Sequence, residues 1–275
     1  MKTIRWFSLA ILLAVSGLVR GAEAPLTLGL FPYVSRGQLM ELHTPLKTYL
    51  EAQLQRPVEM ITAPNFAEFM ARTQQGAYDL ILTAPHLGRL AETRDGYIRV
   101  AKTAHQVFGV FLVRKDSGIR SLADLKGKTI MMAQPISIIY QLGVDELRQN
   151  GLVPGQDITV IGSLTHNNAL YAPVRRESDA SVTGFVLWDK ADPEVRAQLR
   201  EIGRTPAVPG FMLMANRRLP AELIKRIQVA VLGFDKTNEG KAYFSATEFK
   251  HFEKIDDKTM RQLDPYTRAL TKQTP

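Results

Sequence analysis

Cysteine is absent from the 275-residue sequence, and this absence excludes several properties of the protein. No disulfide can hold the chain together, so the folded state must depend on a buried apolar core. Thiol catalysis and metal sites built from thiolates are excluded for the same reason. A lipid anchor on an N-terminal cysteine is excluded as well, and we therefore expect a protein that is not a lipoprotein.

Clusters of basic residues are also missing, although the formal net charge is +8. The lysines and arginines are spread along the chain and form no stripe or long run. Nucleic-acid binding is therefore not expected, because it needs a continuous basic surface. The positive surplus would instead attract a small anionic ligand or an acidic protein surface.

The longest apolar run lies near the N-terminus, from Trp6 to Leu18, and is too short to span a bilayer comfortably. Basic residues precede it and small residues, Ala22 and Ala24, follow it, which is the pattern of a secretory signal peptide. We predict a signal peptide over residues 1–24, cleavage near residues 21–24 and export to the periplasm. An anchored helix is the alternative, and Arg20 argues against it by ending the apolar run early.

Strand patterns alternate with helix patterns along the rest of the chain. Runs of apolar residues predict strands at residues 26–30, 57–63, 78–84, 108–113, 128–133, 157–161, 181–187 and 211–215. Helical spacing and capping residues predict the intervening helices, among them residues 137–150, 193–201 and 220–234. This alternation is typical of an α/β fold with mostly parallel sheets.

Two of these apolar strands, 108–113 and 211–215, bracket a block of about one hundred residues. We predict two α/β lobes joined by two crossovers, with lobe I at residues 25–110 and 215–275 and lobe II at residues 111–214. Ligands of such sheets bind beyond the carboxyl ends of the strands. In a two-lobed protein this position is a cleft that closes by a hinge.

One segment predicts a binding site by its local structure. Residues 135–140 follow a strand and begin a helix, whose N-terminus offers unpaired N–H groups and a positive dipole end to an anion. Ser137 provides the one hydroxyl of the turn ahead of the bulky Ile138, Ile139 and Tyr140. An ordinary helix-capping role for Ser137 remains the alternative.

Several longer motifs carry a resemblance to a known family. They are PLKTYL at residues 45–50, GAYDL at 76–80 leading to Ala84-Pro85, RKDSGIRSLADLKGK at 114–128, residues 163–169, and Pro209-Gly210. With these motifs, the chain resembles the periplasmic solute-binding proteins for phosphate, phosphite and phosphonates of ABC transporters. The resemblance covers essentially the whole mature chain and implies a type II periplasmic binding fold and a monomer.

The resemblance also implies a ligand loop at residues 135–140. In the family this loop is rich in serine, threonine and glycine and wraps the anion. Ser137 matches its first serine. Ile138 stands where threonine is usual, Ile139 where a second serine is usual, and Tyr140 where glycine is usual.

Three further positions are carried over from the family. His166 matches the histidine of a His-Asp pair, while Asn167 replaces its carboxylate. Phe108 lies near a position where the family often has a tyrosine hydroxyl. The resemblance therefore implies a solute receptor and leaves the choice of solute open between an oxyanion and a small organic acid.

Other residues at predicted strand ends complete the candidate site. His86 follows the strand 78–84, and the aromatic residues Phe31 and Tyr33 follow the strand 26–30. Together with Phe108 and Tyr140 they predict a cleft with apolar walls, which suits an organic ligand. No third metal ligand accompanies His86 and His166, so neither a metal nor a cofactor is expected. Nothing around His43, His105 or His251 indicates a role.

The leading hypothesis is therefore a non-catalytic solute-binding protein that delivers a small, anionic ligand to the membrane permease of an ABC transporter. In a related version, its partner is the periplasmic domain of a sensor kinase. A third possibility is an interaction module that has lost small-molecule binding, which predicts a cleft filled by Tyr140 or Phe108. An enzyme is disfavoured, because no catalytic triad order or nucleotide loop stands out.

Overall fold

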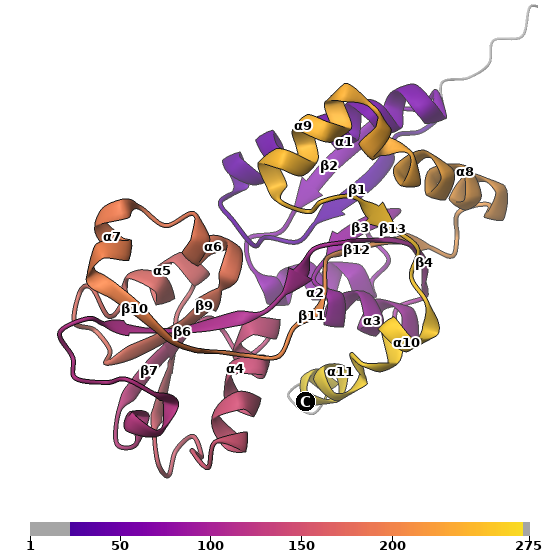
Figure 1. Ribbon diagram of the computed structural model, residues 1–275. Coiled ribbons are helices and arrows are strands. Elements are labelled where there is room, and N and C mark those ends of the chain that lie inside the picture. Colours follow the sequence, from indigo (N-terminus) through magenta and orange to yellow (C-terminus); the bar gives the residue numbers. More distant parts are fainter. Residues whose placement is uncertain (1–22, 272–275) are drawn as a thin grey trace, which may run out of the picture.

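The computed structural model describes residues 23–271 and consists of two lobes, each built around its own β-sheet (Figure 1). The predicted signal peptide lies outside the described residues, apart from Glu23 and Ala24. The predicted two-lobed α/β architecture is confirmed. In the described part of the chain, no helix is long and apolar enough to cross a membrane.

The sheet of the first lobe has six strands in the order β13-β4-β12-β3-β1-β2. Strands β1, β2 and β3 run parallel, whereas β12 and β13 pair antiparallel with their neighbours. Because helices cover both faces, the central strands are almost wholly apolar and buried. Its strands are β1 (Leu26–Leu30), β2 (Val58–Thr62), β3 (Leu80–Thr83), β4 (Tyr97–Thr103), β12 (Met212–Asn216) and β13 (Phe252–Glu253).

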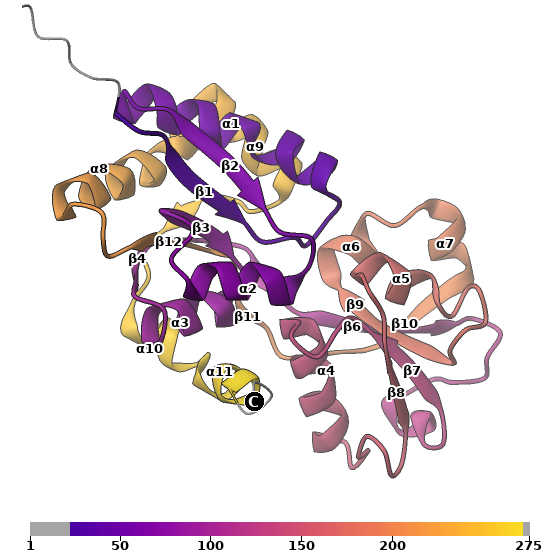
Figure 2. The ribbon, with the colours of Figure 1, turned by 180° about the vertical axis from the view of Figure 1, so that it is seen from behind.

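The helices of the first lobe form a layer on each face of this sheet (Figures 1 and 2). One layer has α1 (Arg36–Leu54), α8 (Ala221–Leu232) and α9 (Asn238–Thr247), and the other has α2 (Phe66–Gln74), α3 (Pro85–Thr93), α10 (Asp257–Arg261) and α11 (Asp264–Thr271). Leucines at helical spacing turn one side of α1 into the core. A short 3-10 helix, Phe234–Lys236, links α8 to α9.

The sheet of the second lobe has five strands in the order β10-β6-β9-β7-β8. Strands β7, β8 and β9 run parallel, and β6 pairs antiparallel with β9 and β10. Its strands are β6 (Gly109–Arg114), β7 (Thr129–Met132), β8 (Thr159–Gly162), β9 (Ala180–Gly184) and β10 (Leu199–Arg204).

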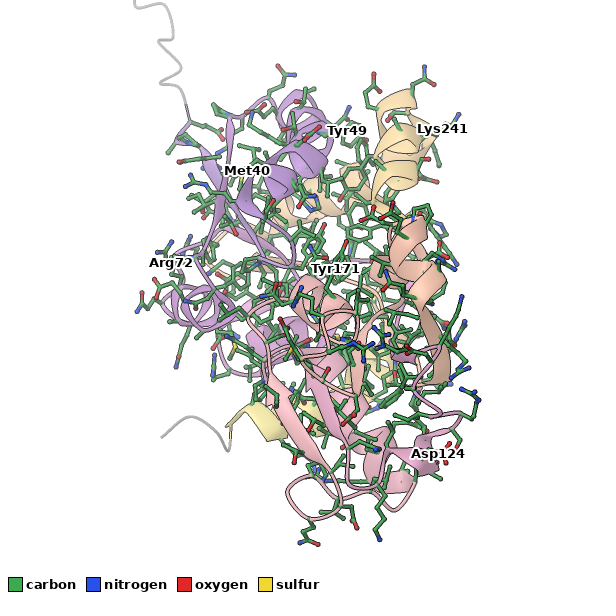
Figure 3. The ribbon with its side chains drawn as sticks, turned by 90° about the vertical axis from the view of Figure 1, so that its left-hand side faces the viewer. Met40, Tyr49, Arg72, Asp124, Tyr171 and Lys241 are labelled. Atoms are coloured by element: carbon green, nitrogen blue, oxygen red, sulfur yellow. The ribbon has the colours of Figure 1, made fainter. Side chains whose placement is uncertain are left out.

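Helices also cover both faces of the second sheet. Helix α4 (Ile138–Gln149) packs on one face, and α5 (His166–Tyr171), α6 (Phe185–Asp189) and α7 (Pro193–Gln198) lie on the other. Helix α5 stops before Pro173, as expected for a residue that cannot continue a helix. A 3-10 helix, Leu122–Leu125, begins with a cap in which the backbone N–H of Ser121 donates to the carboxylate of Asp124, the residue labelled in Figure 3.

Two short strands carry the chain between the lobes. Strands β5 (Gln106–Val107) and β11 (Val208–Pro209) pair with each other in an antiparallel ribbon. Strand β6 follows in the second sheet, whereas β12 already belongs to the first. We therefore propose lobe boundaries within this ribbon, in place of residues 110 and 214.

Three local predictions were wrong. Residues 185–187 are not the end of a strand but the start of α6, and residues 199–201 are not helical but begin β10. Strand β4 was missed, because its charged residues Arg99 and Lys102 interrupt the apolar pattern. Both charges form ion pairs with side chains of other elements, which the local pattern does not reveal.

Candidate functional site

A cavity of about 420 Å³ lies between the lobes. The parallel strands β1 and β3 of one sheet and β9 of the other end at its wall, as ligand sites of open α/β sheets do. Eight of the predicted site residues line it: Phe31, Tyr33, Phe108, Ser137, Ile138, Ile139, His166 and Asn167. Which of them contact a ligand stays a prediction.

Ser137 lies at the N-terminus of α4, where the chain leaves β7. Its Oγ accepts a hydrogen bond from the N–H of Ile139 at 3.2 Å, so it is a helix cap. The side chain is 3% exposed and also faces the cavity. The capping role and a ligand-binding role are therefore compatible, because a hydroxyl oxygen has two lone pairs and a donor.

His166 is the first residue of α5 and lies beside Ser137. Its Nε2 is 3.2 Å from the Ser137 Oγ, and its Nδ1 is buried with no partner among the described residues. Burial lowers the pKa of His166 to about 4, so the ring is neutral at pH 7. A neutral imidazole with one free nitrogen offers either a donor or an acceptor to a ligand. Asn167 adds an exposed amide beside it.

Aromatic rings form much of the remaining wall. Phe108 stacks on Phe185 with ring centroids 4.7 Å apart, and the Arg204 guanidinium lies 5.5 Å from the Phe108 centroid. On the other side, Tyr33 and Phe211 pack edge to face, with ring centroids 4.9 Å apart. Such a wall suits an apolar or polarisable ligand body.

Lys190 is the one lysine or arginine among the described residues that line this inner cavity. Its Nζ donates to the carbonyl oxygen of Ala246 at 3.1 Å and lies 3.2 Å from a Glu248 carboxylate oxygen. Its charge is thus already compensated by the first lobe. Any anion in the cavity must therefore be held mainly by hydrogen bonds and the N-terminus of α4.

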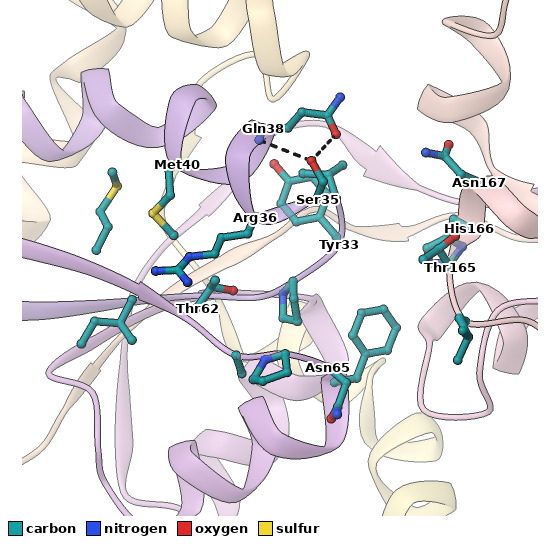
Figure 4. A pocket seen from close by; sticks show the side chains of 18 of the residues that line it. Tyr33, Ser35, Arg36, Gln38, Met40, Thr62, Asn65, Thr165, His166 and Asn167 are labelled. Carbon is teal, nitrogen blue, oxygen red and sulfur yellow. Dashed lines mark hydrogen bonds between the residues drawn. The ribbon is translucent and has the colours of Figure 1, made fainter.

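The inner cavity adjoins a larger open groove of about 1060 Å³. Both are lined by Tyr33, His166 and Asn167, so the two spaces meet at these residues. Figure 4 shows Arg36 and Tyr33 on one side of the groove and Asn167 on the other.

Two predicted site residues lie elsewhere. His86 is fully buried and lines neither the cavity nor the groove; its Nε2 donates to the Ile136 carbonyl oxygen at 2.8 Å. Tyr140 packs against the apolar core below the loop and lines neither space. The cleft is therefore not filled by Tyr140, and Phe108 stands in its wall and leaves the cavity open.

Several lining residues were missed by sequence reasoning. Phe211 was seen only as part of a strand, and Phe249 lies in the C-terminal segment that showed no clear pattern. His105 stacks on Phe249 with centroids 4.8 Å apart. These residues reach the cavity wall only because segments distant in the sequence pack together, and no local motif predicts such packing. Across residues 23–271, no cluster of three or more metal-ligating side chains occurs.

Two α/β lobes with a cavity at their facing strand ends define a type II periplasmic binding protein. The model of the family described as ABC transporter, phosphonate, periplasmic substrate-binding protein matches residues 28–260, and the chain belongs to this family. Members are periplasmic proteins that bind small ligands and serve ABC transporters.

Solved structures show the same fold. PhnD1 from Prochlorococcus marinus (MIT 9301), in complex with methylphosphonate, superposes with a TM-score of 0.80 at 19% identity, covering 90% of this chain and 98% of that one. A binding protein component of an ABC phosphonate transporter from Pseudomonas aeruginosa gives a TM-score of 0.76 at 20% identity, covering 89% and 87%.

A curated relative comes from a different kind of system. The tetrathionate sensor histidine kinase TtrS of Salmonella typhimurium (strain LT2) is 29% identical over 211 residues, which are 70% of this chain and 34% of the kinase. The chain therefore spans about a third of the length of that relative.

Proposed function

We propose that the protein binds a small oxyanion between its lobes, with the oxygens at Ser137 and His166 and an apolar or polarisable remainder against the aromatic wall. One observation carries this proposal: Ser137, His166 and the N-terminus of α4 converge on a cavity that is otherwise mainly apolar. Polar anchors in an apolar cavity are the usual composition of a small-molecule site. Among the described residues that line the inner cavity, no cation is left uncompensated, which favours a ligand end group with one charge over a doubly charged phosphate.

The family and the solved neighbour that holds methylphosphonate support a phosphonate as one candidate ligand. The similarity to a tetrathionate sensor supports a sulfur oxyanion as the other. Sulfonate and thiosulfonate groups are weak bases that stay unprotonated. They would need no carboxylate partner, which agrees with Asn167 in place of an acidic residue.

Calorimetric titration of residues 25–275 tests the proposal with methylphosphonate, methanesulfonate, tetrathionate and inorganic phosphate. We expect one of the organic or sulfur anions to bind more tightly than phosphate, because only these have a part that fits the apolar wall. If phosphate bound as tightly as the other anions, the aromatic wall would contribute nothing to ligand binding. Absence of binding by all four would overturn the proposal and favour an interaction module.

We further propose a non-catalytic, monomeric protein, exported by cleavage of residues 1–24, that hands its ligand to a permease. Mass spectrometry of the periplasmic protein tests the cleavage. A sensor-kinase partner is the second candidate and rests on the similarity to TtrS. Deletion of the gene separates the two: loss of ligand uptake supports the permease, and loss of ligand-dependent transcription with normal uptake supports the kinase.

A further inference from the structure

His43 of α1 is buried between two tyrosine hydroxyls. Its Nε2 lies 3.1 Å from the Tyr33 Oη, and its Nδ1 lies 3.0 Å from the Tyr243 Oη. His43 is 0% exposed and Tyr243 is 1% exposed, whereas Tyr33 is half-buried in the wall of the inner cavity. The three side chains thus form a chain of hydrogen bonds that leads from the core of the first lobe to the ligand cavity.

The protons of this chain can be counted. Burial lowers the pKa of His43 to about 4, so the ring is neutral at pH 7 and has one N–H. A neutral imidazole donates from one nitrogen and accepts at the other. One tyrosine must therefore donate to His43, and the other must accept from it.

The surroundings of the two hydroxyls decide which is which. Tyr243 packs in the core beneath α1, and its hydroxyl has no other partner among the described residues. If it accepted from His43, its own proton would be buried without an acceptor, which is unfavourable because the hydroxyl would lose its hydrogen bond to water and gain none in the protein. Tyr243 therefore donates to Nδ1, and His43 carries its proton on Nε2 and donates it to Tyr33.

Tyr33 then accepts from His43, and its own proton must point to another acceptor. No described residue other than His43 hydrogen-bonds the Tyr33 hydroxyl. The ring stands in the wall shared by the inner cavity and the groove (Figure 4). A ligand oxygen or a water in that space is the remaining acceptor.

We propose that His43 and Tyr243 are positioning residues that make the Tyr33 hydroxyl a hydrogen-bond donor to the ligand. The inference rests on the proposed function and adds a requirement to it: the ligand presents an acceptor atom toward Tyr33. A cationic or donor-only ligand is disfavoured at this wall. Tyr33, from the first lobe, thereby adds a second hydroxyl to the site, which already has that of Ser137 from the second lobe.

The tautomer of His43 tests the positioning without any ligand. Long-range ¹H–¹⁵N correlation spectra of ¹⁵N-histidine-labelled residues 25–275 at pH 7 distinguish the two neutral tautomers. His43 is identified as the imidazole whose signals move in both Tyr33→Phe and Tyr243→Phe. We expect the Nε2–H tautomer in the wild type and in Tyr33→Phe, because Tyr243 donates in both. An Nδ1–H tautomer, or a protonated ring, would overturn the proposal.

Ligand affinity tests the role of Tyr33. With methylphosphonate and tetrathionate as probes, Tyr33→Phe is expected to bind its anion about tenfold more weakly or worse, since it loses a hydrogen bond to a charged group. Tyr243→Phe should weaken binding by a smaller factor. The matched control is Tyr49→Phe, which loses a hydroxyl of the same lobe that donates to the Ala230 carbonyl oxygen (Figure 3).

The outcomes separate this inference from the proposed function. Equal affinities of wild type and Tyr33→Phe would overturn the donor role. If neither probe binds the wild type while the Nε2–H tautomer is observed, the proposed function fails and the hydrogen-bond order of the three residues stands.

Discussion

His86 of the first lobe donates its Nε2–H to the carbonyl oxygen of Ile136 in the second lobe, at 2.8 Å. Ile136 directly precedes Ser137, so this bond fixes the loop that leads into the N-terminus of α4. His86 therefore acts on the candidate site from outside, as a link between lobes. Its position at the end of β3 was predicted from the sequence; its partner was not.

His86→Phe is expected to shift the protein toward an open arrangement of the lobes. The variant keeps a ring of similar size and loses one hydrogen bond, worth about 1 kcal/mol, or roughly a fivefold change in the ratio of closed to open forms. Small-angle scattering should show a larger radius of gyration. His251→Phe, at an exposed histidine of the same lobe, is the control. An unchanged radius in His86→Phe would show that other contacts hold the lobes.

Ser137→Ala is expected to weaken ligand binding by about tenfold or more, because a hydrogen bond to a charged group is lost. The ligand is the anion of the titration series above that the wild type binds most tightly. The substitution also removes a helix cap. Thr237→Ala removes a comparable cap at α9, where Thr237 Oγ1 accepts from the Gly240 N–H at 2.9 Å, far from the cavity. Calorimetry should show weaker binding only for Ser137→Ala. Equal effects of both variants would reduce Ser137 to a structural cap.

Stability is expected to fall as the solution becomes acidic. Burial lowers the pKa of four histidines from 6.5 to about 4: His43, His86, His105 and His166. Between these values the unfolded chain binds more protons than the folded one, so stability is complete above about pH 6.5 and is lost as pH falls toward 4. Each histidine contributes up to about 1.4 kcal/mol per pH unit.

Urea unfolding between pH 7.5 and 4.5 measures this slope. His86→Phe should make this slope shallower by about one proton. A free energy of unfolding that does not vary over this range would mean that the four rings are solvated in solution.

Substitution by glycine is expected to have opposite effects on stability at two glutamines that end helices. Gln55 ends α1 with φ +53°, in the left-handed region, and Gln75 ends α2 with φ −73°. Gln55→Gly should raise stability by up to about 1 kcal/mol, because glycine adopts this conformation without strain. Gln75→Gly should lower it by a similar amount. Thermal unfolding of both variants is the measurement, and shifts of the same sign would contradict the argument.

Gly210→Ala is expected to destabilise the junction between the lobes. A Cβ at Gly210 would lie 2.4 Å from the Thr103 Oγ1 and 2.6 Å from the His105 carbonyl oxygen, so the backbone must move. Overpacking of this kind costs about 1–3 kcal/mol. Gly162→Ala, which meets no atom within 4 Å, is the control. Equal melting temperatures of the two variants would show that the crossover can shift freely.

Much of the fold could be predicted from the sequence, because its information is local. The buried strands are continuous apolar runs, Asn65 and Ser121 are residue types that favour helix caps and do cap helices, and Pro173 lies just beyond the end of α5. Strand β4 could not be predicted, since Arg99 is held by Glu92 and Asp257, which come from different elements.

The site divides in the same way. Ser137 and His166 were found because each begins a helix after a strand, which is a local pattern. His43 gave no signal, because its partner Tyr243 is 200 residues away. Phe249 was missed for a similar reason: it reaches the cavity only through the packing of the C-terminal segment. Tyr140 was placed at the site by its neighbours in sequence, whereas the helix turns it into the core.

The paired crossovers restrict how the lobes can move. Two independent linkers would allow one lobe to slide, twist and tilt against the other. Here Val107 pairs with Val208 across the ribbon, so the two connections must bend together. We therefore expect any opening of the lobes to follow mainly one angle, which a single interlobe distance would report. Because the chain has no native thiol, two introduced cysteines would carry the dyes that report this distance in single molecules.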